Sequence, residues 1–249
     1  MPELRRLLIT GLNGTLAPHL AAAARAEGIE VVAWDRSRLD PDDPASFKQL
    51  AQLEDRLDGI AHLAMGSVAW AERLALWAAE RGLPLLFTST AMVFDHEPDG
   101  PHGINDMRTA RDDYGRYKIQ CEDAIRGASQ AAGIARIGWQ IDGLAPGNNM
   151  LMALDQWQRE RGVIQASRAW RPACSFMGDT AAALLALLRE GFAGVTHLDS
   201  NAQTGLTFDA VVHALKQRFK RTDWRIEVTE DYRHDQRLVG GVPLPPLQP

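Results

Sequence analysis

The first half of the chain alternates short apolar runs with longer helical patterns, and this alternation is the strongest constraint on its fold. Four runs have the length and β-rich composition of buried strands: 7–10, 30–33, 59–64 and 85–88. Between them, apolar residues recur at helical spacing over three stretches: 17–27, 44–56 and 67–80. Such alternation is typical of βαβ units and a parallel sheet. It predicts an α/β fold of the Rossmann type, with a doubly wound parallel sheet.

The pattern loosens after residue 140, where glycine, proline and asparagine become frequent. Before that point we expect a helix over 112–129 and a strand over 135–137. Beyond it, three helices are predicted over 149–161, 179–190 and 208–219, and short strands over 163–166, 195–198 and 225–228. The proline-rich end, 242–249, predicts an extended tail. We expect one domain over 1–249, with 1–140 mainly a dinucleotide-binding core and 141–249 mainly a small C-terminal substrate lobe.

Charge and cysteine content exclude several classes of protein. The 249 residues carry a formal net charge of −5, which argues against the basic surface that nucleic acid requires. No apolar stretch approaches the roughly 20 residues needed to cross a membrane. The two cysteines, Cys121 and Cys174, are too few and too far apart for a disulfide framework or a zinc cluster. We therefore expect a cytoplasmic protein that binds no metal, nucleic acid or membrane.

A glycine turn follows the first predicted strand and leads into a helix. It contains Gly11, Leu12, Asn13 and Gly14. Gly11 permits a tight turn, Gly14 lets backbone N–H groups approach a pyrophosphate, and a helix N-terminus favours negative charge. Ala17 stands in place of a third glycine and still allows close packing of helix and strand. Taken alone, the motif also fits an ordinary strand-to-helix turn.

Asp35 follows the second predicted strand, about 20 residues beyond the turn, where an acidic residue can bind the adenosine ribose hydroxyls. That position favours NAD. Arg36 stands beside it and could instead pair with the 2′-phosphate of NADP. A solvated surface pair is the alternative for both residues, so the sequence leaves NAD and NADP undecided.

Three further residues have the types and spacing of a proton-transfer site. Thr90 follows closely on the fourth predicted strand, at the sheet edge where α/β folds bind ligands. Tyr114 and Lys118 stand four residues apart on one face of a predicted helix. A tyrosine that exchanges protons at neutral pH needs its anion stabilised by roughly 4 kcal/mol, and a lysine cation can supply part of this. The plainer alternative for Tyr114 and Lys118 is a helix-surface pair.

At these positions the chain resembles the extended short-chain dehydrogenase/reductases, and among them the dTDP-4-dehydrorhamnose reductase branch, also called sugar-nucleotide-binding proteins. The resemblance spans nearly the whole chain. Six segments carry it: the turn 11–17, 31–37 with 39–40, Ser89-Thr90 with Val93-Phe94-Asp95, Tyr114 to Lys118 with Glu122, Arg136-Ile137-Gly138-Trp139, and 235–238 with 242–246.

The resemblance implies NAD(P)H as cofactor and a role for each member of the site. Thr90 would bind a keto oxygen, Tyr114 would donate a proton, and Lys118 would lower the pKa of Tyr114 and hold the nicotinamide ribose. The strand end at His62, Leu63 and Ala64 is predicted to line the cofactor. For the substrate we expect contacts from Thr90 and Ala91, and from the lobe residues Arg168, Trp170 and Arg171, because a nucleotide base and diphosphate need an aromatic platform and cations.

Three departures from the family pattern bear on function. Ala91 stands where the reductase branch has aspartate, and a Thr-Ala pair is more like the epimerases of the superfamily. Tyr117 replaces a small residue before the lysine. The chain also runs from Ala64 through Met65-Gly66-Ser67 almost directly into a helix, whereas relatives carry a longer connection that helps to cover the cofactor.

The sequence therefore favours an NAD(P)H-dependent reductase of a keto group, most simply on a sugar nucleotide. One alternative is a sugar-nucleotide epimerase with tightly held NAD, and another is a non-catalytic, cofactor-binding regulatory protein of the same fold. The keto substrate stays unnamed. A homodimer and a monomer both stay open, because the usual dimer helices of relatives lie near the shortened connection.

Overall fold

The computed structural model describes residues 3–53, 56–144 and 147–247, and a six-stranded sheet dominates it. Its strands are β1 (Arg6–Thr10), β2 (Glu30–Ala33), β3 (Gly59–His62), β4 (Leu85–Thr90), β5 (Gly133–Ile137) and β10 (Gly194–Leu198). The strands lie in the order β10-β5-β4-β3-β1-β2. β1 pairs in parallel with β2 on one side and with β3 on the other. From β1 the chain adds β2 on one side of the sheet and then β3 on the other, so the strand order reverses at this point. Open α/β sheets bind ligands at such a point.

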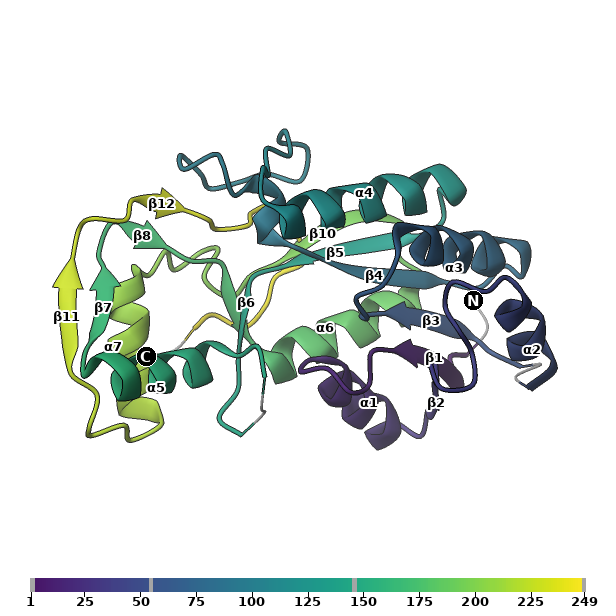
Figure 1. Cartoon of the computed structure of the whole chain (residues 1–249), viewed down its shortest axis with the longest axis horizontal. Helices are drawn as coiled ribbons and strands as arrows, with labels where there is room; N and C mark the ends of the chain where they lie inside the picture. Colours follow the sequence, from purple (N-terminus) through teal and green to yellow (C-terminus); the bar gives the residue numbers. More distant parts are fainter. Residues whose placement is uncertain (1–2, 54–55, 145–146, 248–249) are drawn as a thin grey trace. The chain divides into compact units, whose positions relative to one another are not determined.

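Helices cover both faces of this sheet. They are α1 (Ala17–Ala26), α2 (Ala45–Leu53), α3 (Val68–Glu80), α4 (Asp113–Ala128) and α6 (Met177–Glu190). Figure 1 shows α3 and α4 along one face of the sheet, and α1 and α6 along the other. The predicted doubly wound α/β fold is therefore confirmed.

The helical spacing of α3 explains how it packs. Trp70, Leu74 and Trp77 lie on one side of the helix and are at most 7% exposed, within a core cluster shared with β1, β3 and β4. The hydroxyl of Ser67 caps the helix by accepting a hydrogen bond from the Trp70 N–H at 3.0 Å. The helix therefore starts directly after the short connection from β3.

Two compact units make up the chain, and they interleave along it. The first comprises Met1–Ser89, Arg116–Ala135 and Ala181–Thr196, and the second comprises Thr90–Gly115, Arg136–Thr180 and His197–Pro249. The chain thus passes between the units several times rather than once near residue 140. The assignment of cofactor and substrate binding to separate halves of the chain stays a prediction.

The second unit is built from short elements around its own core. They are η1 (Ala91–Phe94), β6 (Trp139–Ile141), α5 (Met150–Arg161), β7 (Ile164–Ser167), β8 (Trp170–Arg171), β9 (Cys174–Phe176), α7 (Phe208–Arg218), β11 (Ile226–Thr229) and β12 (His234–Asp235). β7 pairs with β11, β8 with β12, and β6 with β9. Phe208 and Trp224, each 1% exposed, anchor the core between the helices and these strands.

Most predicted elements are present, with one correction and several omissions. The strand predicted at 195–198 was expected in the small lobe, which is wrong, because β10 is the edge strand of the six-stranded sheet. The strands β6, β8, β9 and β12 were not predicted, since two or three residues show no usable alternation. Residues 54–55 of the helix predicted over 44–56, and 248–249 of the predicted tail, lie outside the described residues.

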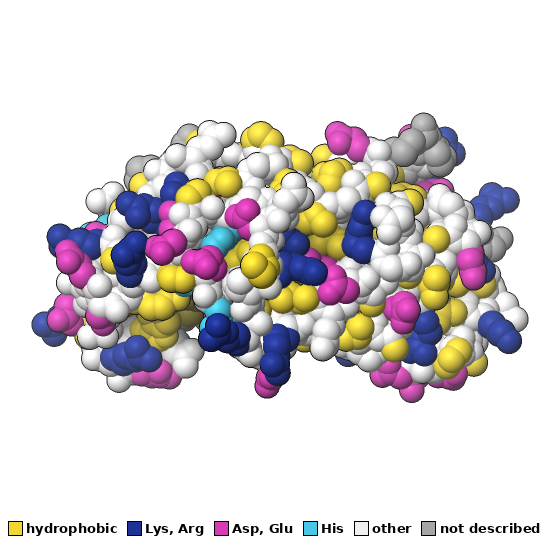
Figure 2. All heavy atoms as spheres, turned by 90° about the horizontal axis from the view of Figure 1, so that it is seen from above, with side chains coloured by type: hydrophobic (Ala, Val, Ile, Leu, Met, Phe, Trp, Pro, Cys, Tyr) yellow, Lys and Arg dark blue, Asp and Glu magenta, His cyan; other side chains and the backbone are white. Residues whose placement is uncertain are grey.

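Charged side chains of both signs occur on the surface of the molecule. On the face that Figure 2 shows, Lys and Arg side chains are mixed with Asp and Glu. None of the helices in the described part of the chain is long and apolar enough to span a membrane. The expectation that the chain binds no nucleic acid stays a prediction.

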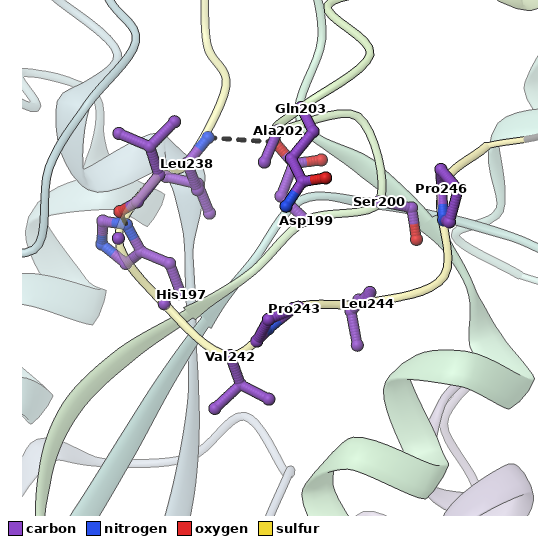
Figure 3. A pocket seen from close by; sticks show the side chains of 13 residues that line it. His197, Asp199, Ser200, Ala202, Gln203, Leu238, Val242, Pro243, Leu244 and Pro246 are labelled. Atoms are coloured by element: carbon purple, nitrogen blue, oxygen red, sulfur yellow. Dashed lines mark hydrogen bonds between the residues drawn. The ribbon is translucent and has the colours of Figure 1, made fainter.

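The C-terminal segment is tied to the end of β10 by one buried carboxylate, that of Asp199. One of its oxygens accepts hydrogen bonds from the N–H groups of Cys174 at 3.0 Å and Asn201 at 2.8 Å. The other accepts from the Leu238 N–H at 3.0 Å, the bond dashed in Figure 3. Beyond Leu238 the segment borders a small cavity, which Ser200 also lines close to Pro246 (Figure 3).

Burial of Asp199, which is 5% exposed, outweighs these hydrogen bonds and raises its pKa from 3.8 to about 6. The folded form therefore holds the proton more tightly than the unfolded chain does. The contribution of Asp199 to the free energy of unfolding is therefore fully present below about pH 4. It is lost as the pH rises through about 6.

We expect Asp199→Asn to flatten the pH dependence of stability, because an amide cannot ionise. The shift corresponds to roughly 3 kcal/mol of unfolding free energy between pH 4 and pH 7. Urea unfolding of the wild type and the variant at several pH values measures it. Asp223→Asn, at an exposed position, is the control. Equal pH slopes for the wild type and Asp199→Asn would show that Asp199 is not the responsible group.

Candidate functional site

A cavity of about 730 Å³ opens in the first unit where β1, β2 and β3 end. This volume lies within the range of small-molecule sites. Three chain segments line it: Gly11 to Gly14 after β1, Ala33 to Ser37 at the end of β2, and Leu63 to Met65 after β3. The structure thus brings together every residue predicted to bind the cofactor except His62 and Lys118, which do not line this cavity.

The hydroxyl of Thr10 holds two residues that line the cavity, Leu63 and Ala64. It accepts hydrogen bonds from the N–H groups of Leu63 and Ala64, each at 3.1 Å, and lies 2.8 Å from His62 Nδ1. Because the hydroxyl oxygen already accepts two N–H bonds, it donates its own hydrogen to Nδ1. The ends of β1 and β3 are therefore held together through one side chain.

His62 lies behind the cavity wall rather than in it. Its imidazole is 1% exposed and packs between Trp70 and Phe87, with ring centroids 4.7 and 5.4 Å away. Burial, reinforced by the Lys118 and Arg36 cations, lowers its pKa to about 3, so the ring is neutral. His62 thus supports the cavity through Thr10, and a direct contact with cofactor stays a prediction.

The glycine turn lies too close to the segment after β3 to carry a side chain at Gly11. Gly11 has a φ of +80°, and a Cβ there would lie 2.9 Å from the Ala64 backbone nitrogen. The Gly14 N–H donates to the Gly11 carbonyl at 2.8 Å and closes the turn. Gly11 is therefore required both by its backbone conformation and by the close approach of the segment after β3.

Asp35 and Arg36 lie on the same rim of the cavity but have different partners. The exposed Asp35 carboxylate accepts hydrogen bonds from the Ser37 N–H at 2.9 Å and the Ser37 hydroxyl at 2.7 Å. These bonds, the hydroxyl first, lower the pKa of Asp35. The Arg36 guanidinium donates to the Met65 carbonyl and lies 5.0 Å from the Trp70 ring centroid.

A second cavity, of about 560 Å³, lies in the second unit. It contains four of the residues predicted to act on substrate: Thr90, Ala91, Tyr114 and Trp170. Arg168 and Arg171 do not line it, and the exposed Arg168 lies 3.5 Å from Glu230 instead.

Thr90 and Tyr114 form the polar pair of this cavity. Their side chains share a hydrogen bond, and the Thr90 hydroxyl also accepts from the Met92 N–H at 3.2 Å. Burial raises the pKa of Tyr114, while the bond with Thr90 lowers it less strongly. The phenol therefore carries its proton at neutral pH, as a proton donor must.

Lys118, one helical turn beyond Tyr114 on α4, is an interior cation of the first unit. Its side chain is 4% exposed, donates to the Thr88 carbonyl at 2.9 Å and lies 4.6 Å from the Phe87 ring centroid. Burial lowers its pKa from 10.5 to about 8. The amine is therefore mostly charged at pH 7 and loses its charge within the range in which enzymes are assayed.

Several cavity residues were not predicted, because they come from distant short elements. Trp139 and Tyr232 line the second cavity, and the Trp170 indole donates to the Gln236 amide oxygen at 2.8 Å. The Gln236 amide in turn donates to Asp95 at 3.2 Å. Gln236 is 66 residues from Trp170 in sequence, a separation that no local pattern reveals.

One group of side chains could hold a metal ion. Ligand atoms of Asp95, His96 and Asp112 lie within 4.8 Å of one another. Two of them have structural partners, since His96 Nδ1 accepts from the Arg111 N–H at 2.9 Å and Asp112 accepts from the Gly115 N–H at 2.8 Å. We assign no metal to this group, and the expectation that the chain binds none stays a prediction.

Comparison with known proteins gives a consistent family assignment. The model of the RmlD substrate binding domain matches residues 64–219. A dTDP-4-dehydrorhamnose reductase of Mycobacterium tuberculosis is 28% identical over 206 residues, which are 76% of this chain and 67% of the relative.

Two solved structures show that the fold is shared. The first is dTDP-4-dehydrorhamnose reductase from Bacillus anthracis in complex with NADP, with a TM-score of 0.80, 17% identity, and coverage of 97% of this chain and 95% of that one. The second is UDP-N-acetylglucosamine 4-epimerase from Bacillus cereus, with a TM-score of 0.72, 15% identity, and coverage of 93% and 88%.

The close approach at Gly11 generates a stability prediction. Gly11→Ala should destabilise the protein by at least about 1 kcal/mol more than Gly28→Ala, because overpacking adds to the cost of the left-handed backbone. Gly28 is the matched control, since its φ is +76° but a Cβ there would meet nothing within 4 Å. Urea unfolding measures both variants. Equal losses would contradict a tight contact between Gly11 and Ala64.

Proposed function

Because the chain belongs to the RmlD substrate binding domain family of extended short-chain dehydrogenase/reductases, we propose that it is an NAD(P)H-dependent reductase of a keto group on a sugar nucleotide. The observation that carries the proposal is the hydrogen-bonded pair of Thr90 and Tyr114 in a cavity of the second unit. The named activity of the relatives supports the same reaction and the same class of substrate.

The first cavity fits a dinucleotide. Its glycine turn packs directly against the Ala64 backbone, and backbone N–H groups of the turn suit a pyrophosphate. Asp35 would hold the adenosine ribose, and Leu63 and Ala64 would flank the bound molecule. When bound, reduced nicotinamide dinucleotide supplies the hydride that reduces a carbonyl carbon.

The chain's own residues bind the carbonyl oxygen and move one proton. The hydroxyls of Thr90 and Tyr114 donate hydrogen bonds to that oxygen, which fixes the orientation of the keto group. As the oxygen gains negative charge, the Tyr114 O–H bond breaks and its proton passes to the oxygen, which leaves a phenolate and an alcohol. The ammonium of Lys118 stabilises this phenolate, and its pKa of about 8 keeps it charged at neutral pH.

Sugar-nucleotide binding rests on the aromatic wall of the second cavity. Trp170 would stack against a ring of the substrate, next to Ala91 and Thr90. Arg168 and Arg171 are our candidates for the diphosphate, although they do not line the cavity. We expect the protein in a reducing cytoplasm, because both cysteines are free and buried.

Two other functions are each favoured by one feature. Ala91, 8% exposed in the second cavity, favours an epimerase that holds NAD tightly and shows no net cofactor turnover. The short connection after Ala64 favours a non-catalytic cofactor-binding protein. NAD retained through purification would identify an epimerase. Cofactor binding without turnover would identify a non-catalytic protein.

The mechanism predicts the effect of removing one hydroxyl. Tyr114→Phe should lower kcat for keto-sugar nucleotide reduction by at least about a hundredfold, since general acid catalysis contributes that much or more. Cofactor affinity should change little, because the phenol lies in the second cavity. Steady-state kinetics and calorimetric titration with cofactor measure the two effects.

Tyr232→Phe is the matched control, because Tyr232 also lines the second cavity but its hydroxyl is bonded to His234 at 2.9 Å. Its loss should cost much less turnover than the loss of the Tyr114 hydroxyl. Wild-type turnover in Tyr114→Phe would exclude Tyr114 as the proton donor.

A further inference from the structure

The connection from β3 to α3 is only five residues long, from Leu63 to Ser67, yet its central residues are held on three sides. Arg36, from the end of β2, donates to the Met65 carbonyl. The Gly66 N–H donates to the Tyr117 hydroxyl of α4 at 3.1 Å. The Ser67 hydroxyl donates to the Asp42 carboxylate. We call residues 65–67 the clasp.

Tyr117 of α4 joins the core of the first unit to the clasp. Its ring packs against the main core cluster of the first unit, and its hydroxyl reaches the backbone of Gly66. Gly66 cannot be replaced without movement, because a Cβ there would lie 2.4 Å from the Trp70 ring. The connection is therefore fitted closely to α3 and α4.

The clasp determines where the Arg36 guanidinium lies. Besides its bond to Met65, the guanidinium lies 5.0 Å from the Trp70 ring centroid. One of its nitrogens is 3.6 Å from the position that a Gly66 Cβ would take. Three separate observations thus place this cation against the clasp. Asp35 keeps its carboxylate exposed on the cavity rim, held by Ser37.

We propose that the clasp engages Arg36 as a positioning residue for the cofactor cavity and thereby makes NADH the preferred cofactor. The inference rests on the proposed function in taking the first cavity as the dinucleotide site. Both residues line the cavity, but the Arg36 guanidinium is bonded to Met65, so we take the Asp35 carboxylate as the charge that meets the adenosine ribose. A carboxylate accepts hydrogen bonds from ribose hydroxyls and repels a 2′-phosphate.

The test is calorimetric titration of the full chain with NADH and with NADPH. NADH should bind at least about tenfold more tightly, as expected for hydrogen bonds to a charged group. Asp35→Asn should reduce that ratio about tenfold by removing the repulsion. Arg36→Ala should weaken both cofactors by the same factor, because the clasp loosens under either one. Arg38→Ala, which removes an exposed guanidinium two residues away, is the charge control.

Tyr117→Phe keeps the ring and removes only the bond to Gly66. It should weaken both cofactors about three- to tenfold without changing their ratio. If Tyr117→Phe lowers Tm but leaves both Kd values as in the wild type, Tyr117 serves stability alone. That result would overturn its role in holding the clasp.

Two results would overturn the inference. If NADPH binds as tightly as NADH and Arg36→Ala weakens NADPH alone, Arg36 serves the 2′-phosphate, and the reductase function is untouched. If neither cofactor binds, the first cavity is not a dinucleotide site, and the proposed function fails together with the inference.

Discussion

The buried hydroxyl of Thr10 joins the ends of β1 and β3, and the rest of the cofactor cavity depends on it. These neighbouring strands flank the point at which the sheet changes direction. The hydroxyl has three partners, the N–H groups of Leu63 and Ala64 and the His62 ring. Leaving those two N–H groups unpaired would cost roughly 1–3 kcal/mol each. The bonds also bring the Ala64 backbone against Gly11, so only glycine fits at the start of the turn.

The short connection after β3 is held in place by side chains from other parts of the first unit. Arg36, which follows β2, donates to the Met65 carbonyl. The hydroxyl of Tyr117, on α4, accepts from the Gly66 N–H. The connection borders a cavity of about 730 Å³, which we propose as the dinucleotide site.

What could be predicted from the sequence was local in the chain. Helical and strand periodicity located the βαβ units, and the four-residue spacing placed Tyr114 and Lys118 on α4. Contacts between distant residues were beyond prediction. The partners of Tyr117 and Trp170 lie 51 and 66 residues away, and β10 joins a sheet whose neighbouring strand β5 ends 57 residues earlier. Such pairings depend on packing across the fold, which a single sequence does not encode in any short window.

The most direct test of the central claim, that the cavity at the ends of β1, β2 and β3 holds a nicotinamide dinucleotide, is backbone hydrogen exchange followed by mass spectrometry. The full chain would be compared with and without NADH. The account predicts slower exchange in peptides that contain residues 11–16, 34–37 and 63–67, because the ligand would cover those amides and rigidify the segments. Unchanged exchange at all three segments under saturating NADH would contradict it.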